Sequence, residues 1–319
     1  MDEVKGLLDE LEQAKEVWLE DRGVFLLKLK SVSSRLADCI EATSQDEVPG
    51  LLEVVLGEVE REDSSSNILS FATALAKDNQ KERCKDGGDL LQHVAELLGA
   101  LQQQHPKLAR PQLTRLVKLA KALFFCHPTA KVRVAGLQLL ETCVTAPSPG
   151  SKEQEKLAKD LGVESLASKL HNALASRLQP SVLAKLRCLL GVTVRSFPEH
   201  LQLLQLELRN SFIREMDRAM AATTASLDLT LVEGTLAGLN ALLTAFPFED
   251  GEEGREKLYE LLRKLCRLVM NGMMRKTNMI SRRPEHEDVI VRRGAMRTAL
   301  DLFATHSTLF SDQVWYCPR

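Results

Sequence analysis

The strongest constraint on the fold is a long succession of helical hydrophobic patterns. Apolar residues recur every three or four positions along the chain, and we find no convincing strand alternation. The pattern predicts helices over 2–20, 22–42, 46–62, 67–78, 90–104, 110–126, 129–145, 152–176, 179–197, 199–221, 227–246, 253–273 and 288–305. Asp89 is expected to be the N-cap of the helix over 90–104.

The breaks between these helices are short, such as the His-Pro pairs at 105–106 and 127–128. Two longer polar segments, 146–154 and 246–254, are expected to be exposed loops rather than linkers between domains. Helices of about 15–22 residues joined by short loops predict antiparallel pairs, and many pairs in a row predict an α-solenoid rather than a closed bundle. We therefore predict an all-α fold without a sheet, forming one continuous array over 1–319.

One helix pattern occurs twice, as 129-TAKVRVAGLQLLETCV-144 and 288-DVIVRRGAMRTALDLF-303. In HEAT repeats the second helix of a pair commonly opens with Val-Arg. The small residues at Gly136, Ala295 and Ala299 predict close helix approach, and Leu140 and Leu302 are expected to fill the core. Arg133 and Arg292 are expected to tie a neighbouring loop through carboxylates or carbonyls. The alternative is chance recurrence of Val-Arg. No 40-residue period covers the chain, so the expected pairs are degenerate HEAT-like repeats.

Composition agrees with helices filled by Leu and Ala, because aromatic residues make up only 4% of the chain. Seven cysteines occur without a CxxC pair, which predicts reduced, structural thiols. The first 20 residues are acidic and amphipathic, unlike a secretory signal, and no apolar run has the length of a membrane span. These features predict a soluble, intracellular protein that does not bind a membrane.

Motifs for chemistry are missing from the sequence. No phosphate-binding loop, dinucleotide fingerprint, nucleophile elbow, zinc-protease motif or kinase motif set occurs. The adjacent Cys126 and His127 could suggest a nucleophile or a metal ligand, but Cys126 continues an apolar face and His127 precedes a proline at a helix end. We therefore expect no catalytic residue, metal site, cofactor or small-molecule substrate in this chain.

Charge is distributed unevenly, although the net charge is only −2. Residues 1–63 hold 17 acidic and 7 basic residues, whereas 101–140 hold seven basic residues and no carboxylate. A second basic zone lies within 275–297. Such a zone is either a solvated helix surface or a surface that follows phosphates without reading bases. In the second case the candidate DNA-binding residues are Lys107, Arg110, Arg115, Lys118, Lys121 and Lys131. Arg133 is left out because the repeated helix pattern gives it a structural role.

Several segments resemble a known family in the same order along the chain. They are 189-LLGVTVRSFPEHLQLLQLELRNSFIREM-216, 236-LAGLNALLTAFPFEDGEEGREKLYELLRKLC-266 and 294-GAMRTALDLFATHSTLFSDQV-314, with weaker likeness at 96–125 and 131–144. Over about 70–310 the chain resembles the amino-terminal HEAT-like arm of the DNA-dependent protein kinase catalytic subunit family, within the phosphatidylinositol-3-kinase-related kinases.

The resemblance implies a nuclear role in DNA repair. In that family the arm helps to receive double-stranded DNA ends together with the Ku heterodimer and other repair proteins, in nonhomologous end joining. The family's serine/threonine kinase domain lies far beyond the span represented here, so kinase activity would belong to an intact parent protein. The ending WYCPR leads us to expect a fragment, or else a short natural form. A generic HEAT or armadillo scaffold for proteins, without a DNA role, is the alternative.

Overall fold

The computed structural model describes residues 88–104, 112–145, 152–221, 228–248, 252–267 and 287–307, together with single positions before residue 88. It divides into two compact units, Met1–Gly162 and Val163–Arg319. The described residues form helices and turns and contain no strand, which confirms the all-α prediction. The helices predicted over 2–20, 22–42 and 46–62, and most of 67–78, lie outside the described residues.

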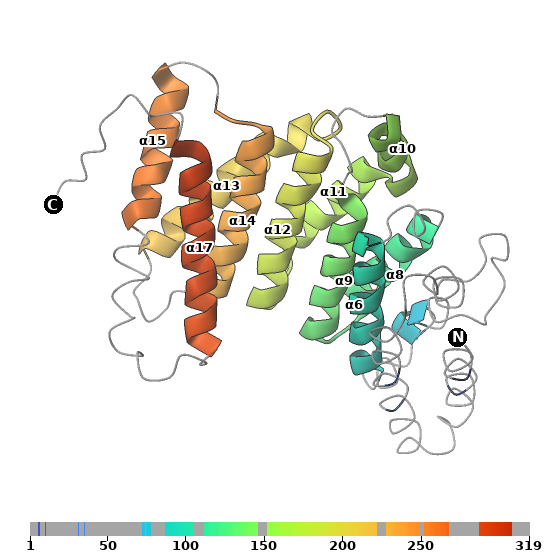
Figure 1. The fold of residues 1–319 in the computed structure, drawn as a ribbon. Coiled ribbons are helices and arrows are strands. Elements are labelled where there is room, and N and C mark those ends of the chain that lie inside the picture. The colour runs from blue at the N-terminus through green and yellow to red at the C-terminus, as the bar shows by residue number, and fades with distance from the viewer. Residues whose placement is uncertain are drawn as a thin grey trace. The chain divides into compact units, whose positions relative to one another are not determined.

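The first unit contains α6 (Gly88–Gln104), α8 (Leu113–Cys126), α9 (Ala130–Val144) and α10 (Lys152–Leu161). Helix α9 contacts both α6 and α8, and α10 contacts α8 (Figure 1). Helix α6 begins at Gly88, so the prediction of Asp89 as N-cap is wrong. Asp89 instead lies in the first turn, where a carboxylate favours the positive end of the helix dipole.

Helices α8 and α9 approach closely at Gly136. A Cβ atom built at this glycine would lie 2.8 Å from the Cβ of Leu123 and 2.9 Å from the carbonyl oxygen of Ala120. Leu140, one turn further along α9, is fully buried. The structure therefore confirms both the close approach and the core leucine predicted for this helix.

Arg133 joins the start of α9 to the end of α8. Its Nε donates a hydrogen bond of 2.9 Å to the carbonyl of Phe124, and its guanidinium lies 5.2 Å from the centre of the Phe124 ring. Partial burial lowers the pKa of Arg133. The hydrogen bond satisfies one of the carbonyls that a helix leaves open at its C-terminal end. The predicted contact of Arg133 with a carbonyl is confirmed, but this carbonyl belongs to the last turn of α8 and not to a loop.

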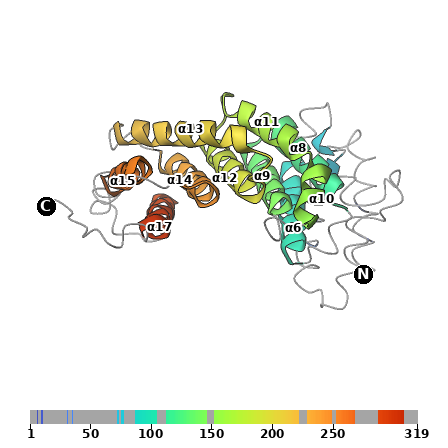
Figure 2. The ribbon, with the colours of Figure 1, turned by 90° about the horizontal axis from the view of Figure 1, so that it is seen from above.

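The second unit contains α11 (Val163–Ala173), α12 (Pro180–Ser196), α13 (Gln202–Ala221), α14 (Leu229–Ala245), α15 (Glu252–Arg267) and α17 (Glu287–Ser307). Helix α14 contacts α12, α13 and α17, so it is the centre of this unit. Figures 1 and 2 show α12, α14 and α17 side by side, with α13 crossing α14 at an angle. Helix α11 contacts α12, and α15 contacts α13 and α17.

The prediction of one helix over 152–176 is wrong. The chain forms α10 and α11 instead, separated by Gly162, whose φ is +59°. A residue in this left-handed region cannot continue a right-handed helix, and glycine adopts the conformation without a steric cost. The two predicted loops are also shorter than expected, because α10 begins at Lys152 and α15 begins at Glu252.

The contact between α12 and α14 is made by backbone atoms at three glycines. A Cβ at Gly191 would lie 2.3 Å from the carbonyl oxygen of Gly238, and one at Gly238 would lie 2.5 Å from the carbonyl oxygen of Arg187. A Cβ at Gly234 would lie 2.3 Å from the carbonyl oxygen of Ala184. These distances are too short for any real Cβ, so the crossing requires residues without a side chain.

Beside this crossing, Arg187 links three helices. Its Nη1 donates a hydrogen bond of 2.7 Å to the Thr235 hydroxyl on α14, and its Nη2 lies 3.2 Å from a carboxylate oxygen of Glu215 on α13. Burial lowers the pKa of Arg187, and the charge of Glu215 opposes that effect. A buried charge is tolerated because both partners are present.

The second copy of the repeated pattern, α17, also behaves as predicted. Ala295, Ala299 and Leu302 are buried, and α17 packs on α14. At this contact, a Cβ built at Gly294 would lie 2.6 Å from a carboxylate oxygen of Glu233. The side chain of Arg292 lies outside the described residues, so its predicted role stays a prediction.

Candidate nucleic-acid interface

Helix α8 carries three of the six candidate DNA-binding residues. Lys118 is exposed, whereas Arg115 and Lys121 are half-buried. Arg115 donates a hydrogen bond of 2.9 Å from Nη1 to the side-chain oxygen of Gln112, within the same turn of chain. We define the α8 stripe as Thr114, Lys118, Lys121 and Phe125, whose spacing of four, three and four residues places them on one side of the helix.

Lys131 lies on a different surface from Lys118. Leu123 and Gly136 meet at the contact between α8 and α9. Lys118 is five residues before Leu123, and Lys131 is five residues before Gly136. Five residues correspond to about 140° around a helix of 3.6 residues per turn. Lys118 therefore lies on the side of α8 away from α9, and Lys131 on the side of α9 away from α8. Lys118 and Lys131 therefore do not share one side of this helix pair, and Lys107 and Arg110 lie outside the described residues.

Carboxylates are absent from the whole of α8, and in α9 they begin only at Glu141 in the last turn. Helix α10, which contacts α8, carries three acidic and three basic residues and so adds no net charge. Taken together, α8, α9 and α10 therefore carry a net positive charge. Phe125, 43% exposed at the end of the stripe, was not among the residues that sequence reasoning selected. The sequence feature that could have pointed to Phe125 is the pair of adjacent phenylalanines, of which only Phe124 is buried.

The second basic zone is only partly described. Arg293 and Arg297 are exposed on α17 and lie four residues apart, on one side of that helix. The remaining basic residues of 275–292 lie outside the described residues or have side chains that do. The structure therefore places two arginines of this zone together.

The Cys126–His127 pair has a structural explanation. Cys126 is exposed at the end of α8, whereas His127 is 2% exposed and its Nδ1 accepts a hydrogen bond of 3.1 Å from the backbone N–H of Thr129. The imidazole thus fixes the turn between α8 and α9. Burial raises the pKa of the Cys143 thiol to about 12, which keeps it protonated and unreactive.

Two further histidines lie near carboxylates. His171 is 3.6 Å from Glu207, and His200 is 3.8 Å from Glu164. Both contacts connect α11 with α13 or with the residues just before it. Among the residues that the structure describes, no group of three His, Cys, Asp or Glu side chains could hold a metal ion. None of the described helices is long and apolar enough to span a membrane.

The fold and this site define the class of protein: an all-helical protein with closely packed helix pairs and a basic outer helix surface. Comparison with protein families then identifies the group. The family model described as "DNA-PKcs, N-terminal" matches residues 88–315, and the chain belongs to this family. The match confirms the resemblance predicted from the sequence and covers all of the helices described above. No curated protein sequence matches the chain.

Proposed function

We propose that this chain is a non-catalytic helical arm that supports the binding of DNA ends and of Ku in the repair of double-strand breaks by nonhomologous end joining. Family membership over residues 88–315 is the observation that carries the proposal. This family membership supports a role for the arm within a nuclear DNA-repair protein. Kinase activity would belong to a longer protein that contains this arm.

Within the arm, we propose that duplex DNA contacts the α8 stripe. Lys118 is exposed and Lys121 is half-buried on the same side of a helix without carboxylates. Lysines in such a row can neutralise successive phosphates, and this gives binding that ignores base sequence and weakens with salt. Lys131 is omitted from this surface because it lies on the opposite side of the helix pair.

The test is the salt dependence of duplex binding by the full chain and by a Lys118→Glu, Lys121→Glu double variant. Each neutralised phosphate changes the log–log slope of affinity against salt by about 0.9. Losing two contacts should flatten the slope by about 1.8. Affinity is best measured with short duplexes from about 50 mM salt upward, with and without Ku.

The matched control reverses two exposed charges of the second unit, Lys169→Glu and Arg177→Glu. This variant has the same net charge, so a general charge effect would change both slopes equally. Circular dichroism checks that each variant keeps its helices. If the two variants and the wild-type chain bind duplex DNA and Ku–DNA alike, the α8 stripe is a solvated surface, and a generic scaffold for proteins becomes the better explanation.

A further inference from the structure

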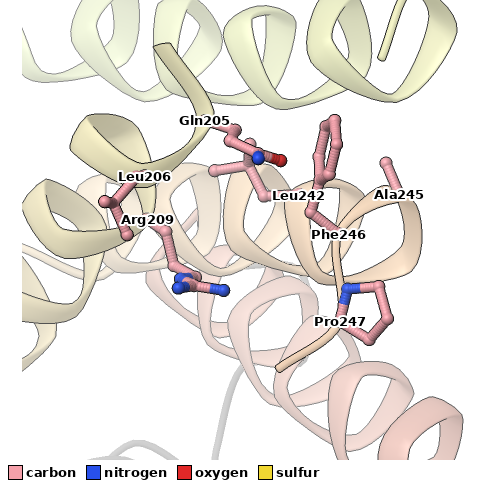
Figure 3. A pocket seen from close by; sticks show the side chains of 7 residues that line it. All are labelled: Gln205, Leu206, Arg209, Leu242, Ala245, Phe246 and Pro247. Carbon is pink, nitrogen blue, oxygen red and sulfur yellow. The ribbon is translucent and has the colours of Figure 1, made fainter. Parts of the chain in front are cut away.

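A groove lies between α13 and α14 in the second unit, far along the sequence from the α8 stripe. It has a volume of about 320 Å³ and is open to solvent on one side. Its lining residues come from the first half of α13, the last turn of α14 and the two residues that follow: Gln205, Leu206, Arg209, Leu242, Ala245, Phe246 and Pro247. Figure 3 shows the Gln205 amide directed toward the Phe246 ring, with Leu206 and Pro247 at opposite ends of the groove.

The groove combines an apolar lining with two polar groups of specific kinds. Leu206, Leu242, Phe246 and Pro247 supply the apolar part, and Arg209 is the charged residue among those that line it. The Arg209 guanidinium lies 4.7 Å from the centre of the Phe248 ring, a cation–π contact that helps to hold it at the groove. An occupant with an aliphatic side chain and a negative charge would complement this lining.

Gln205 supplies the second polar group. Its Oε1 is buried and accepts no hydrogen bond from the part of the chain that the structure describes. A buried acceptor without a donor costs free energy, and if the amide turned toward the groove, an N–H group of an occupant would satisfy it. A peptide backbone carries such a donor at every residue except proline.

Helix α13 exposes two leucines, of which Leu206 lines the groove. Leu203 is 96% exposed and Leu206 is 53% exposed, and they are three residues apart on the same side of the helix. The volume is at the lower end of ligand-binding cavities, which suits one or two side chains better than a cofactor. The exposed leucines extend the apolar surface past the groove, as an extended partner requires and a small ligand does not.

We propose that the α13–α14 groove docks a short peptide segment of a partner protein in which leucine side chains are flanked by glutamate. A leucine enters between Leu206, Leu242 and Phe246, a backbone N–H donates to Oε1 of Gln205, and a glutamate carboxylate pairs with Arg209. The sequence contains a signal for this surface, because 201-LQLLQLEL-208 has more leucines than one buried helix face can hold. This leucine pattern does not predict the groove, because the groove also needs residues of α14.

The probe is the peptide acetyl-Gly-Glu-Leu-Leu-Glu-Gly-amide, added to the full chain labelled at leucine methyl groups for NMR. We expect saturable shifts of the Leu206 and Leu242 methyl signals and none at Leu300 on α17. A peptide with glutamine in place of both glutamates should bind about fivefold more weakly, the size of a charge pair at a half-open site. A peptide with lysine at these positions should bind more weakly still.

Two variants separate docking from a loss of fold. Arg209→Ala should reduce affinity for the glutamate peptide about fivefold and leave affinity for the glutamine peptide unchanged. Leu206→Ser should reduce affinity for both peptides, whereas the control Leu300→Ser should reduce neither. The two leucines are matched, with 53% and 56% of their surface exposed. If Arg209→Ala partly unfolded the protein, its affinity for both peptides would fall equally. The comparison of Leu206→Ser with Leu300→Ser would then test the docking proposal.

The proposal is overturned if glutamate and lysine peptides bind equally, or if Leu206→Ser and Leu300→Ser have the same effect. It is also overturned if the Leu206 and Leu242 signals shift with protein concentration alone, because the groove would then be covered by a second copy of the chain.

Discussion

At the scale of single residues, Arg133 and Arg187 show what a sequence pattern can and cannot predict. Arg133 follows Val132 at the start of a recurring helix pattern, and its partner carbonyl is only nine residues away. Its role could therefore be predicted. Arg187 has a partner on α14 that is 48 residues away, and no local pattern announces a buried arginine in a leucine-rich helix. Its role depends on which helices meet, which local periodicity does not determine.

Glu233 provides a prediction at this scale. Partial burial at the contact between α14 and α17 raises the pKa of its carboxyl group above the ordinary value. A raised pKa in the folded chain means that the protonated form is favoured by folding, so this group stabilises the fold at low pH. The stabilisation is lost as the pH rises through the raised pKa.

Glu233→Gln should therefore raise the urea midpoint at pH 7, because the amide has nearly the same shape without the charge. The gain in stability should be under about 1 kcal/mol, since the carboxylate is still partly hydrated. It should shrink as the pH falls toward the ordinary glutamate value of about 4.3. Urea unfolding of both proteins between pH 4 and pH 8 checks this, and a gain that is independent of pH would contradict the burial argument.

At the scale of elements, the sequence predicted the existence of the helices better than their ends. The helices at 129–145, 179–197 and 227–246 each agree with the structure to within two residues. The prediction over 152–176 is wrong, because hydrophobic spacing continues through Gly162 while the backbone does not. Glycine is tolerated inside helices, so its presence does not reveal which glycine takes a positive φ.

Gly136 and Gly99 give a matched pair of substitutions within the first unit. A methyl group at Gly136 would collide with α8, whereas at Gly99 it would meet only the Thr142 methyl at 3.8 Å, an ordinary contact. Gly136→Ala should cost about 1–3 kcal/mol by overpacking. Gly99→Ala should stabilise the fold by up to about 1 kcal/mol, because alanine loses less backbone entropy in a helix.

Thermal or urea unfolding of the two variants beside the wild-type chain measures this difference. Equal effects of the two alanines would show that the close approach of α8 and α9 does not constrain the fold.

At the scale of the whole molecule, fold class and family could be predicted because they depend on features spread over the chain: helical periodicity and the order of degenerate segments. The site could be predicted only in part. A carboxylate-free stretch of sequence selected Lys118 and Lys131 together, but which side of a helix pair a lysine occupies depends on where the neighbouring helix packs. The α13–α14 groove depends on two helices in the same way.

We propose that the two units belong to one continuous array of HEAT-like helix pairs, as the sequence predicts. Neighbouring repeats in such an array stabilise one another. Leu140→Ala should cost about 2–5 kcal/mol by leaving a cavity in the first unit. In a continuous array it should also speed amide hydrogen exchange in α11 and α12, while the exposed Gln138→Ala should cost under about 0.5 kcal/mol and change neither.

Hydrogen-exchange mass spectrometry of the full chain measures both effects. Faster exchange that is confined to residues 88–161 of the Leu140→Ala protein would contradict a continuous array and favour two independently stable units.

The crossing of α12 and α14 has a consequence for how this sequence can change over evolutionary time. When two side chains touch, growth of one can be compensated by a smaller residue on the other. At Gly191, Gly234 and Gly238 the nearest opposing atom belongs to the backbone, which every amino acid carries. No second substitution on the opposite helix can restore the lost space. A larger residue at any of these three positions therefore cannot be compensated by a change on the opposite helix. It could be accommodated only if α12 and α14 moved apart.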